Sequence, residues 1–152
     1  GGRHLPKKDL GLMTMSYGYV YVTSIALGAN DAHTVKAIKE AEAYDGPSLI
    51  LAYSHCIAHG INMRLGLNEQ KLAVDSGAWM LYRFNPERSK EGQNPFILDS
   101  KKPSISLKDY AYNETRFKSL LKINPKDAEA LMEEAQKEAE AKWKQYEKLA
   151  ES

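Results

Sequence analysis

The sequence predicts an α/β fold with parallel strands, followed by a helical, loop-rich C-terminal extension. Over residues 8–83, short apolar runs alternate with helical patterns, which is the rhythm of a layered α/β protein. Beyond Phe84 the apolar density falls, and proline and glycine punctuate the chain until a long final helix begins. We therefore expect three parts, at residues 1–84, 85–123 and 124–152.

A short helix is expected from Asp9, whose carboxylate can cap it, to Gly18, which can stop it. Its apolar side chains recur at i, i+3 and i+7 and are predicted to face the core: Leu10, Met13 and Tyr17. Residues 19–27 are rich in β-branched and aromatic side chains and are expected to form a strand that runs into the turn at 28–30. Its predicted inward residues are Val20, Val22 and Ile25.

Asn30 or Asp31 is expected to cap a second helix, which Asp45, Gly46 and Pro47 end. Its predicted core-facing side chains are Val35, Ile38, Ala41 and Tyr44. The run at 48–53 is almost continuously apolar over the length of a strand, which is typical of a parallel strand covered by helices on both faces. We expect this strand to be buried.

The rest of the chain is predicted to contain three helices, one short strand and a connecting segment. Residues 68–76 are expected to form a helix, and 78–84 a short strand with Trp79, Leu81 and Tyr82 buried. Residues 85–103 are expected to be a connecting segment around an apolar clip at 96–98, and Ser104 or Ser106 starts a small helix. Asn124 and Pro125 begin the final helix. Its predicted docking stripe is Ala128, Leu131, Ala135, Ala139, Trp143 and Tyr146.

Composition excludes several classes of function. Apolar residues make up 43% and charged residues 27%, which is ordinary for a globular protein, and the net charge of +1 gives no electrostatic footprint for nucleic acid or an acidic membrane. No apolar run approaches the roughly 20 residues that cross a bilayer, and the first residues lack the apolar core of a signal peptide. We therefore expect a cytoplasmic protein without nucleic-acid or membrane partners.

Cys56 is the only cysteine. It lies shortly after an apolar run and is flanked by His55 and His59. In open α/β sheets ligands gather beyond the carboxyl ends of the strands, so its position favours a functional role. Four interpretations stay open: a nucleophile activated by either histidine, a zinc ligand together with His59 and a further residue, an inert buried thiol, or a ligand of an iron–sulfur cluster. Motifs for Walker phosphate loops, serine-hydrolase elbows, zinc proteases and C-x-x-C sites are absent.

Several segments of the sequence resemble the carboxyl-terminal part of single-chain pyruvate:ferredoxin (flavodoxin) oxidoreductases. Two of them are highly specific, Ser-His-Cys-Ile-Ala-His-Gly at 54–60 and Asn-Pro-Phe-Ile-Leu-Asp-Ser at 94–100. The others are 7–13, 16–22, 27–31, 40–50 and 71–77. The element at 40–50 recurs across thiamine-diphosphate enzymes and is less specific. The resemblance covers nearly the whole chain in register.

The resemblance implies that residues 1–84 are the second half of the domain that binds thiamine diphosphate, and that the fold is part of a parallel-sheet thiamine-diphosphate domain. It also implies that Cys56 is the fourth thiolate of the [4Fe-4S] cluster nearest the thiazolium ring. The implied reaction is oxidative decarboxylation of pyruvate with coenzyme A to acetyl-CoA and CO2, with electrons passing to ferredoxin or flavodoxin. The implied assembly is a homodimer.

The sequence also departs from the family. The Gly-Asp-Gly motif that binds the diphosphate and Mg²⁺ is missing, as are the other cluster cysteines and the domain whose glutamate activates thiamine. We therefore expect a fragment that depends on the remaining domains of the same enzyme and is inactive alone. The resemblance assigns it no catalytic residue and no thiamine contact. The alternative function is a non-catalytic module that mediates domain or dimer contacts. For His55 and His59 we expect hydrogen bonds that shape the loop.

Overall fold

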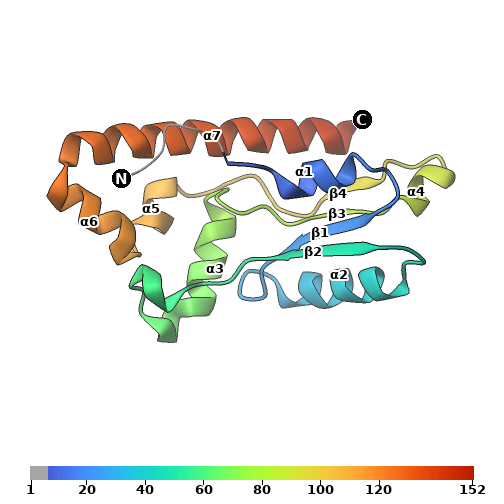
Figure 1. Ribbon diagram of the computed structural model, residues 1–152, viewed down its shortest axis with the longest axis horizontal. Coiled ribbons are helices and arrows are strands. Elements are labelled where there is room, and N and C mark those ends of the chain that lie inside the picture. Colours follow the sequence, from blue (N-terminus) through green and yellow to red (C-terminus); the bar gives the residue numbers. More distant parts are fainter. Residues whose placement is uncertain (1–6) are drawn as a thin grey trace.

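The computed structural model describes residues 7–152 and shows a mixed α/β fold with a helical C-terminal end (Figure 1). The elements, in chain order, are α1 (Leu10–Met15), β1 (Tyr21–Ile25), α2 (Asp31–Ala43), β2 (Ser48–Ala52), the short 3₁₀ turns η1 (Ile57–His59) and η2 (Met63–Leu65), α3 (Gly66–Asp75), β3 (Tyr82–Phe84), α4 (Glu87–Lys90), β4 (Phe96–Leu98), α5 (Leu107–Ala111), α6 (Thr115–Ile123) and α7 (Pro125–Glu151). The predicted fold class is confirmed.

The sheet has the strand order β2-β1-β3-β4 and is only partly parallel. β1 and β2 run parallel, whereas β3 is antiparallel to both β1 and β4. The predicted apolar clip at 96–98 is therefore the edge strand β4. Helices α1 and α7 cover one face of the sheet and α2 covers the other (Figure 1). Helices α3, α5 and α6 gather at one end of the sheet, beyond the carboxyl end of β2 (Figure 1).

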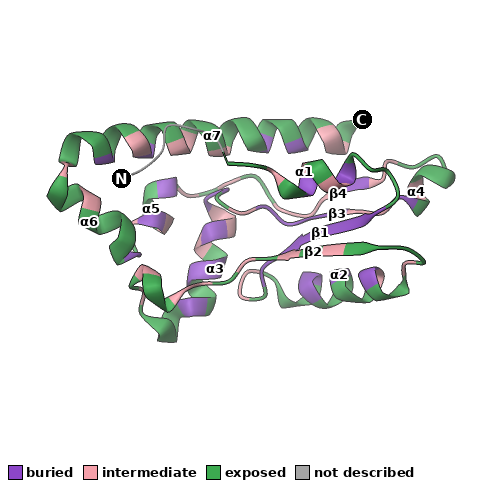
Figure 2. Cartoon of the chain, viewed as in Figure 1, coloured by how far each residue is buried: buried purple, intermediate pink, exposed green. Residues whose placement is uncertain are grey.

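The apolar core lies between the sheet and the helices α1 and α7 (Figure 2). Rings of Tyr82, Phe96 and Tyr146 meet there with centroids 5.2 to 5.6 Å apart, in tilted or edge-on pairs of the kind aromatic rings prefer. The other buried members are Met15, Val20, Val22, Met80 and Trp143. The apolar stripe of α7 therefore packs against this chain, and its buried residues are Ala128, Met132, Trp143 and Tyr146.

The predicted core face of the first helix is wrong. Asp9 caps α1 by accepting a hydrogen bond from the Leu12 N–H at 2.9 Å, as expected, but the three residues predicted inside are exposed. The buried residues are Gly11 and Met15, because α1 approaches the sheet so closely at Gly11 that a Cβ there would clash with the hydroxyl of Tyr82. The three exposed residues are Leu10, Met13 and Tyr17.

The predicted burial of β2 is wrong, and that of α2 is confirmed only in part, since Ala41 is buried and Tyr44 half-buried as expected. Asn30 caps α2 as expected, yet Val35 is 52% and Ile38 44% exposed, while Ala37 and Ala41 face β1 and β2. Strand β2 has the apolar sequence of a central strand but lies at the edge of the sheet, with alternating half-buried and exposed side chains. Both errors have one cause: these apolar positions face outward from this chain, where nothing in residues 7–152 covers them.

Other expectations were closer to the structure. All of β1 is buried, and Leu81 and Tyr82 lie inside as predicted, although Trp79 is only half-buried. Ser106 starts α5 with a capping box, and Asn124 with Pro125 starts α7. Among the helices of residues 7–152, none has the length and apolar character needed to cross a bilayer.

Candidate functional site

Cys56 lies in the loop that joins the carboxyl end of β2 to η1. Its backbone is extended, its thiol is free, and the residue is of intermediate burial, so the described residues do not enclose it fully. The loop leaves the sheet after the Tyr53 N–H donates to the carbonyl of Ile25 at 2.9 Å. The thiol is thus placed where β2 ends, beside α3 and α6, as the sequence predicted.

His55 is fixed to α3 by Gln70. The amide oxygen of Gln70 accepts the Gly28 N–H at 2.8 Å, so its amide nitrogen is left to donate to Nδ1 of His55 at 3.0 Å. The ring proton of His55 is therefore on Nε2, which lies against Gly66, where a Cβ would clash with it. One buried amide thus ties the residue before Cys56 to both α3 and the turn after β1.

His59 is fixed to α6 from the other side of the thiol. Nη1 of Arg116 donates to Nε2 of His59 at 2.8 Å, and because a guanidinium only donates, the ring proton is on Nδ1. Nδ1 lies 3.0 Å from Oε2 of Glu114, a close polar contact whose angle is not that of a good hydrogen bond. The loop-shaping hydrogen bonds expected for both histidines are present.

Two tyrosines contact each other where the loop leaves β2. The hydroxyls of Tyr53 and Tyr110 are 2.6 Å apart, and the ring of Tyr53 packs on Trp79, whose indole N–H donates to the carbonyl of Ile25. Burial, together with the nearby charge of Glu114, raises the pKa of both hydroxyls, so they stay protonated at neutral pH. The loop therefore packs on two uncharged tyrosine side chains.

A small cavity of about 210 Å³ lies behind the loop, lined by Ile61, Asn62, Leu65, Asn68, Glu69, Leu72 and Asn113. Glu69 is buried, and one of its carboxylate oxygens has no hydrogen-bond partner among residues 7–152. Burial, with the negative charge of Glu114 nearby, raises the pKa of Glu69. Sequence reasoning missed both carboxylates, because nothing in their local pattern indicates burial.

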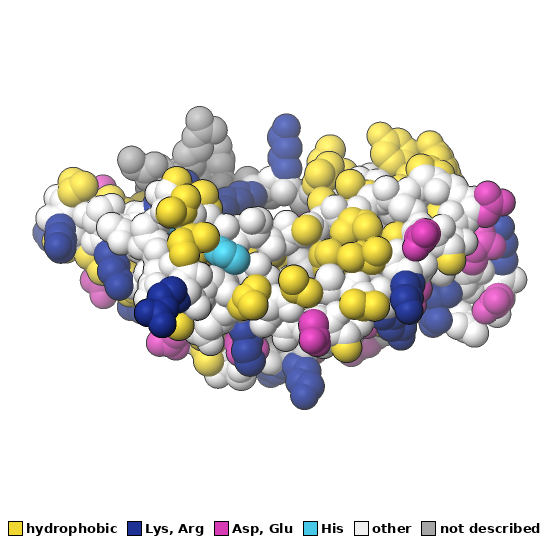
Figure 3. Space-filling view, turned by 90° about the horizontal axis from the view of Figure 1, so that it is seen from below, with side chains coloured by type: hydrophobic (Ala, Val, Ile, Leu, Met, Phe, Trp, Pro, Cys, Tyr) yellow, Lys and Arg dark blue, Asp and Glu magenta, His cyan; other side chains and the backbone are white. Residues whose placement is uncertain are grey.

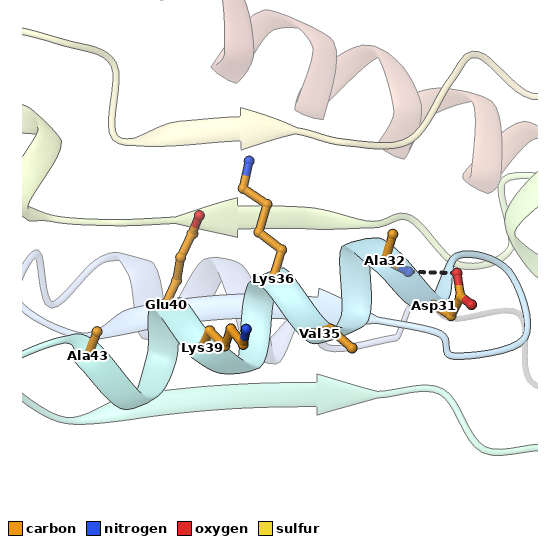
Figure 4. Close-up of a pocket in the computed structure, with 7 residues that line it drawn as sticks. All are labelled: Asp31, Ala32, Val35, Lys36, Lys39, Glu40 and Ala43. Atoms are coloured by element: carbon orange, nitrogen blue, oxygen red, sulfur yellow. Dashed lines mark hydrogen bonds between the residues drawn. The ribbon is translucent and has the colours of Figure 1, made fainter.

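The surface around Cys56 is apolar. Ile57 is 71% exposed, and Met63, Leu65 and Leu67 are about half exposed beside it. Figure 3, seen from the side of α2 and β2, shows patches of hydrophobic side chains among charged ones on this face. A shallow hollow of about 660 Å³ runs along α2, where Lys36 and Glu40 extend toward the side of β3 and β4 (Figure 4). We define the open face as Val35, Ile38, Ile50, Ile57, Met63, Leu65 and Leu67.

The side chains near Cys56 limit its chemistry. Within residues 7–152 no cluster of three His, Cys, Asp or Glu side chains is placed to hold a metal ion, so the zinc interpretation lacks its ligand set there. In the same part of the chain no hydrogen bond joins the thiol to a histidine, and the nitrogens of His59 are occupied by Glu114 and Arg116. The arrangement therefore offers one partly exposed cysteine on a loop whose two histidines are hydrogen-bonded to α3 and α6.

A second polar cluster, which sequence reasoning also missed, lies under α2. Arg83 of β3 donates to Glu40 at 2.6 Å and to both oxygens of Asp99 at 2.8 and 2.9 Å, and His33 contacts Asp99 at 3.0 Å. Burial opposes the charge of Asp99, but hydrogen bonds from His33 and Arg83 outweigh it and lower the pKa of Asp99. The only sequence signal is an arginine inside an apolar strand.

The fold and the loop define a layered α/β segment that carries a single anchored thiol at a strand end. Comparison with known proteins makes this specific: the chain is 56% identical over 150 residues to a pyruvate-flavodoxin oxidoreductase of Trichormus variabilis, and 55% identical over 151 residues to the pyruvate:ferredoxin oxidoreductase of Moorella thermoacetica. A pyruvate-flavodoxin oxidoreductase of Klebsiella pneumoniae is 47% identical over 151 residues. These alignments cover 98 to 99% of the chain but only 13% of each relative. No protein-family model matches the chain.

Proposed function

We propose that this chain is a segment of a pyruvate:ferredoxin or pyruvate-flavodoxin oxidoreductase, and that Cys56 supplies one thiolate of a [4Fe-4S] cluster. The observation that carries the proposal is the identity of 47 to 56% over practically the whole chain to enzymes with these names. The position of the lone, partly exposed thiol at the carboxyl end of β2 supports it.

The donors present fit the role of one ligand among four. A four-iron cluster is normally held by four thiolates, and this chain has a single cysteine. A partly exposed cysteine on an anchored loop can meet ligands from other parts of a longer protein, and the apolar residues near it would exclude water once covered. When bound, the cluster would accept and pass on single electrons. The task of this chain is then to hold one sulfur still.

The open face supports the proposal that the chain completes a larger α/β domain. Parallel strands are normally buried on both faces, yet β2 has exposed side chains. It also pairs only with β1 and leaves its other hydrogen-bonding edge free within the described residues. Since the chain spans about an eighth of the relatives it matches, the missing cover is proposed to come from the remaining domains of the enzyme. We propose that residues 1–84 are the second half of the thiamine-diphosphate domain, with thiamine diphosphate and Mg²⁺ held mainly by those other segments.

The proposed reaction is oxidative decarboxylation of pyruvate with coenzyme A, with ferredoxin or flavodoxin as electron acceptor, in a cytoplasmic homodimer. The test is Cys56→Ala in the complete protein that contains this chain, with iron and sulfide analysis and low-temperature electron spin resonance. We expect the loss of one cluster signal and slower reduction of the acceptor. An unchanged cluster content and spectrum would refute the role of Cys56. The intact mass of the native protein tests whether this chain is part of a longer polypeptide.

The second candidate function is a non-catalytic module that mediates domain or dimer contacts, and the open face favours it. The stripe of α7 is already used inside this chain, so such contacts would be made by α2 and β2. Ile38→Glu in the complete protein discriminates between the two functions by size-exclusion measurement of the oligomer and by cluster content. A smaller oligomer with full cluster content supports the module.

A further inference from the structure

The start of α6 holds the turn after Cys56 by several contacts from three successive residues. The Thr115 hydroxyl and N–H both donate to the carbonyl of Gly60, at 2.8 and 3.3 Å. Arg116 donates to one nitrogen of His59 and Glu114 lies against the other. The turn spans residues 57–60, so every contact is made within four residues of the thiol.

The fit between the two segments is close and leaves the turn little freedom. Gly60 has a φ of 72°, which favours glycine, and a Cβ there would lie 2.6 Å from Cβ of Thr115. Glu114 is only 1% exposed, although burying a carboxylate is costly unless close polar partners compensate. Its two oxygens make no well-aligned hydrogen bond in the described part of the chain, and Oε2 lies 3.0 Å from Nδ1 of His59.

The remaining anchors of the loop act before the thiol. Tyr53 and His55 are fixed by Tyr110 and Gln70, whereas His59 and Gly60, after the thiol, are held by side chains of α6. A loop held at one end can rotate its sulfur, whereas a loop held at both ends presents it in one direction. A bound metal centre demands the second arrangement, because ligand orientation and nearby hydrogen bonds tune the centre.

We propose that Glu114, Thr115 and Arg116 are positioning residues that clasp the turn after Cys56 and so fix the direction in which its sulfur faces. This inference rests on the proposed function. It assigns to α6, which lies far along the sequence from the cysteine, a role in setting the properties of the cluster that Cys56 ligates.

The test uses the complete protein with Thr115→Val, which removes the hydroxyl that donates to Gly60, and Glu114→Gln, which removes the negative charge beside His59; both keep the shape of the side chain. Arg116→Ala is the variant least able to disturb folding, because Arg116 is exposed. Ser119→Ala is the matched control, since Ser119 lies on the same helix and bonds only to the carbonyl of Arg116 in its own helix. Iron and sulfide content, electron spin resonance lines and the midpoint potential of each cluster are measured.

We expect full iron content, with one cluster showing shifted or broadened resonance lines and a shifted midpoint potential in the three clasp variants and not in Ser119→Ala. If all three clasp variants match the control in lines and potential, the clasp is overturned, even where they lower thermal stability. Cys56→Ala measured in parallel separates the two failures. Retention of every cluster in Cys56→Ala refutes the proposed function, whereas loss of a cluster there with unchanged clasp variants refutes the clasp alone.

Discussion

The face of the sheet that carries α1 and α7 is closed by hydrocarbon, whereas the face that carries α2 is joined by hydrogen bonds and ion pairs. On the closed face Tyr82, Phe96 and Tyr146 stack within an apolar cluster. On the other face Arg83 bridges Glu40 and Asp99, and the hydroxyl of Tyr21 donates to Glu40 at 3.0 Å. Beyond this network the apolar side chains of α2 and β2 stay exposed.

The difference shows which surfaces this chain completes by itself. A closed apolar cluster needs no further partner, because its surface is already removed from water and so already stabilises the fold. An exposed apolar face of this size on β2, α2 and the Cys56 loop is the kind of surface that soluble proteins cover by contact with other segments. The chain thus covers one side of its sheet itself and leaves the other side open within residues 7–152.

The largest effect is expected from Tyr146→Ala on the closed face. The ring is 1% exposed and contacts Tyr82 and Phe96, so its removal leaves a cavity and should lower the free energy of unfolding by about 3 to 5 kcal/mol. Urea denaturation of this chain measures it. Tyr146→Phe is the control, because it keeps the ring and removes the hydroxyl with its polar contacts to Asp9 and Tyr82, which should cost about 1 kcal/mol. Equal losses in the two variants would mean that the ring contributes nothing.

A loss of about 3 kcal/mol is expected from Arg83→Met on the ionic face. The change leaves Asp99 and Glu40 without their cation in a largely buried site, which costs more than the pair itself contributes. Adding Asp99→Asn should recover part of the loss, because the uncompensated charge is removed. Lys71→Met, which breaks an exposed pair with Asp75, is the control and should cost about 0.5 kcal/mol or less. If Arg83→Met cost no more than that control, the Arg83 ion pairs would contribute no more than exposed ones.

A smaller effect is expected from Asp9, which joins the start of the chain to α7. Burial opposes its charge, but hydrogen bonds from Lys142 and Tyr146 outweigh it and lower the pKa of Asp9. A lowered folded-state pKa stabilises the fold above the unfolded value of about 4, and this contribution is lost as the pH falls through the folded pKa. Asp9→Asn should cost about 1 kcal/mol at pH 7 and nothing near pH 2.

Unfolding curves of the two proteins between pH 7 and pH 2 measure this convergence. The pKa of Asp99 is lowered as well, so its stabilising contribution is also lost in acid. Both proteins should therefore become less stable as the pH falls. Glu69 has a raised pKa and acts with the opposite sign, since its stabilising contribution is lost as the pH rises through its folded-state pKa. Parallel curves for Asp9→Asn and the unchanged chain would contradict the role assigned to Asp9.

The sequence predicted what is local and missed what depends on distant partners. Asp9, Asn30, Ser106 and Asn124 cap helices as expected, because a cap bonds to its own first turn. The predicted buried faces of α1 and β2 were wrong, and that of α2 was wrong at Val35 and Ile38, because periodicity gives the apolar side of an element and not what covers it. Val35 shows this most clearly, since it lies on the apolar side of α2 and is exposed.

The candidate site divides in the same way. The place of Cys56 beyond β2 followed from the order of strands and the rule for strand ends. The partners of its two histidines did not, because Gln70 lies on the next helix and Glu114 lies more than fifty residues further along the chain. Only the fold brings them to one loop. A buried glutamate has no pattern that distinguishes it from the exposed glutamates of α7.

The smallest effect in this chain is expected on the open face, and it sharpens the comparison most. Ile50 lies on β2 and is 38% exposed, so Ile50→Ser should change the free energy of unfolding of this chain by about 0.5 kcal/mol or less. In the complete protein the same residue is proposed to be covered, so the same substitution should cost about 2 kcal/mol there. Thermal unfolding of this chain and of the complete protein, each with and without the substitution, compares the two losses of stability. A loss that is equally small in the complete protein would show that β2 remains an edge strand, and the proposal that other domains cover the open face would then fail.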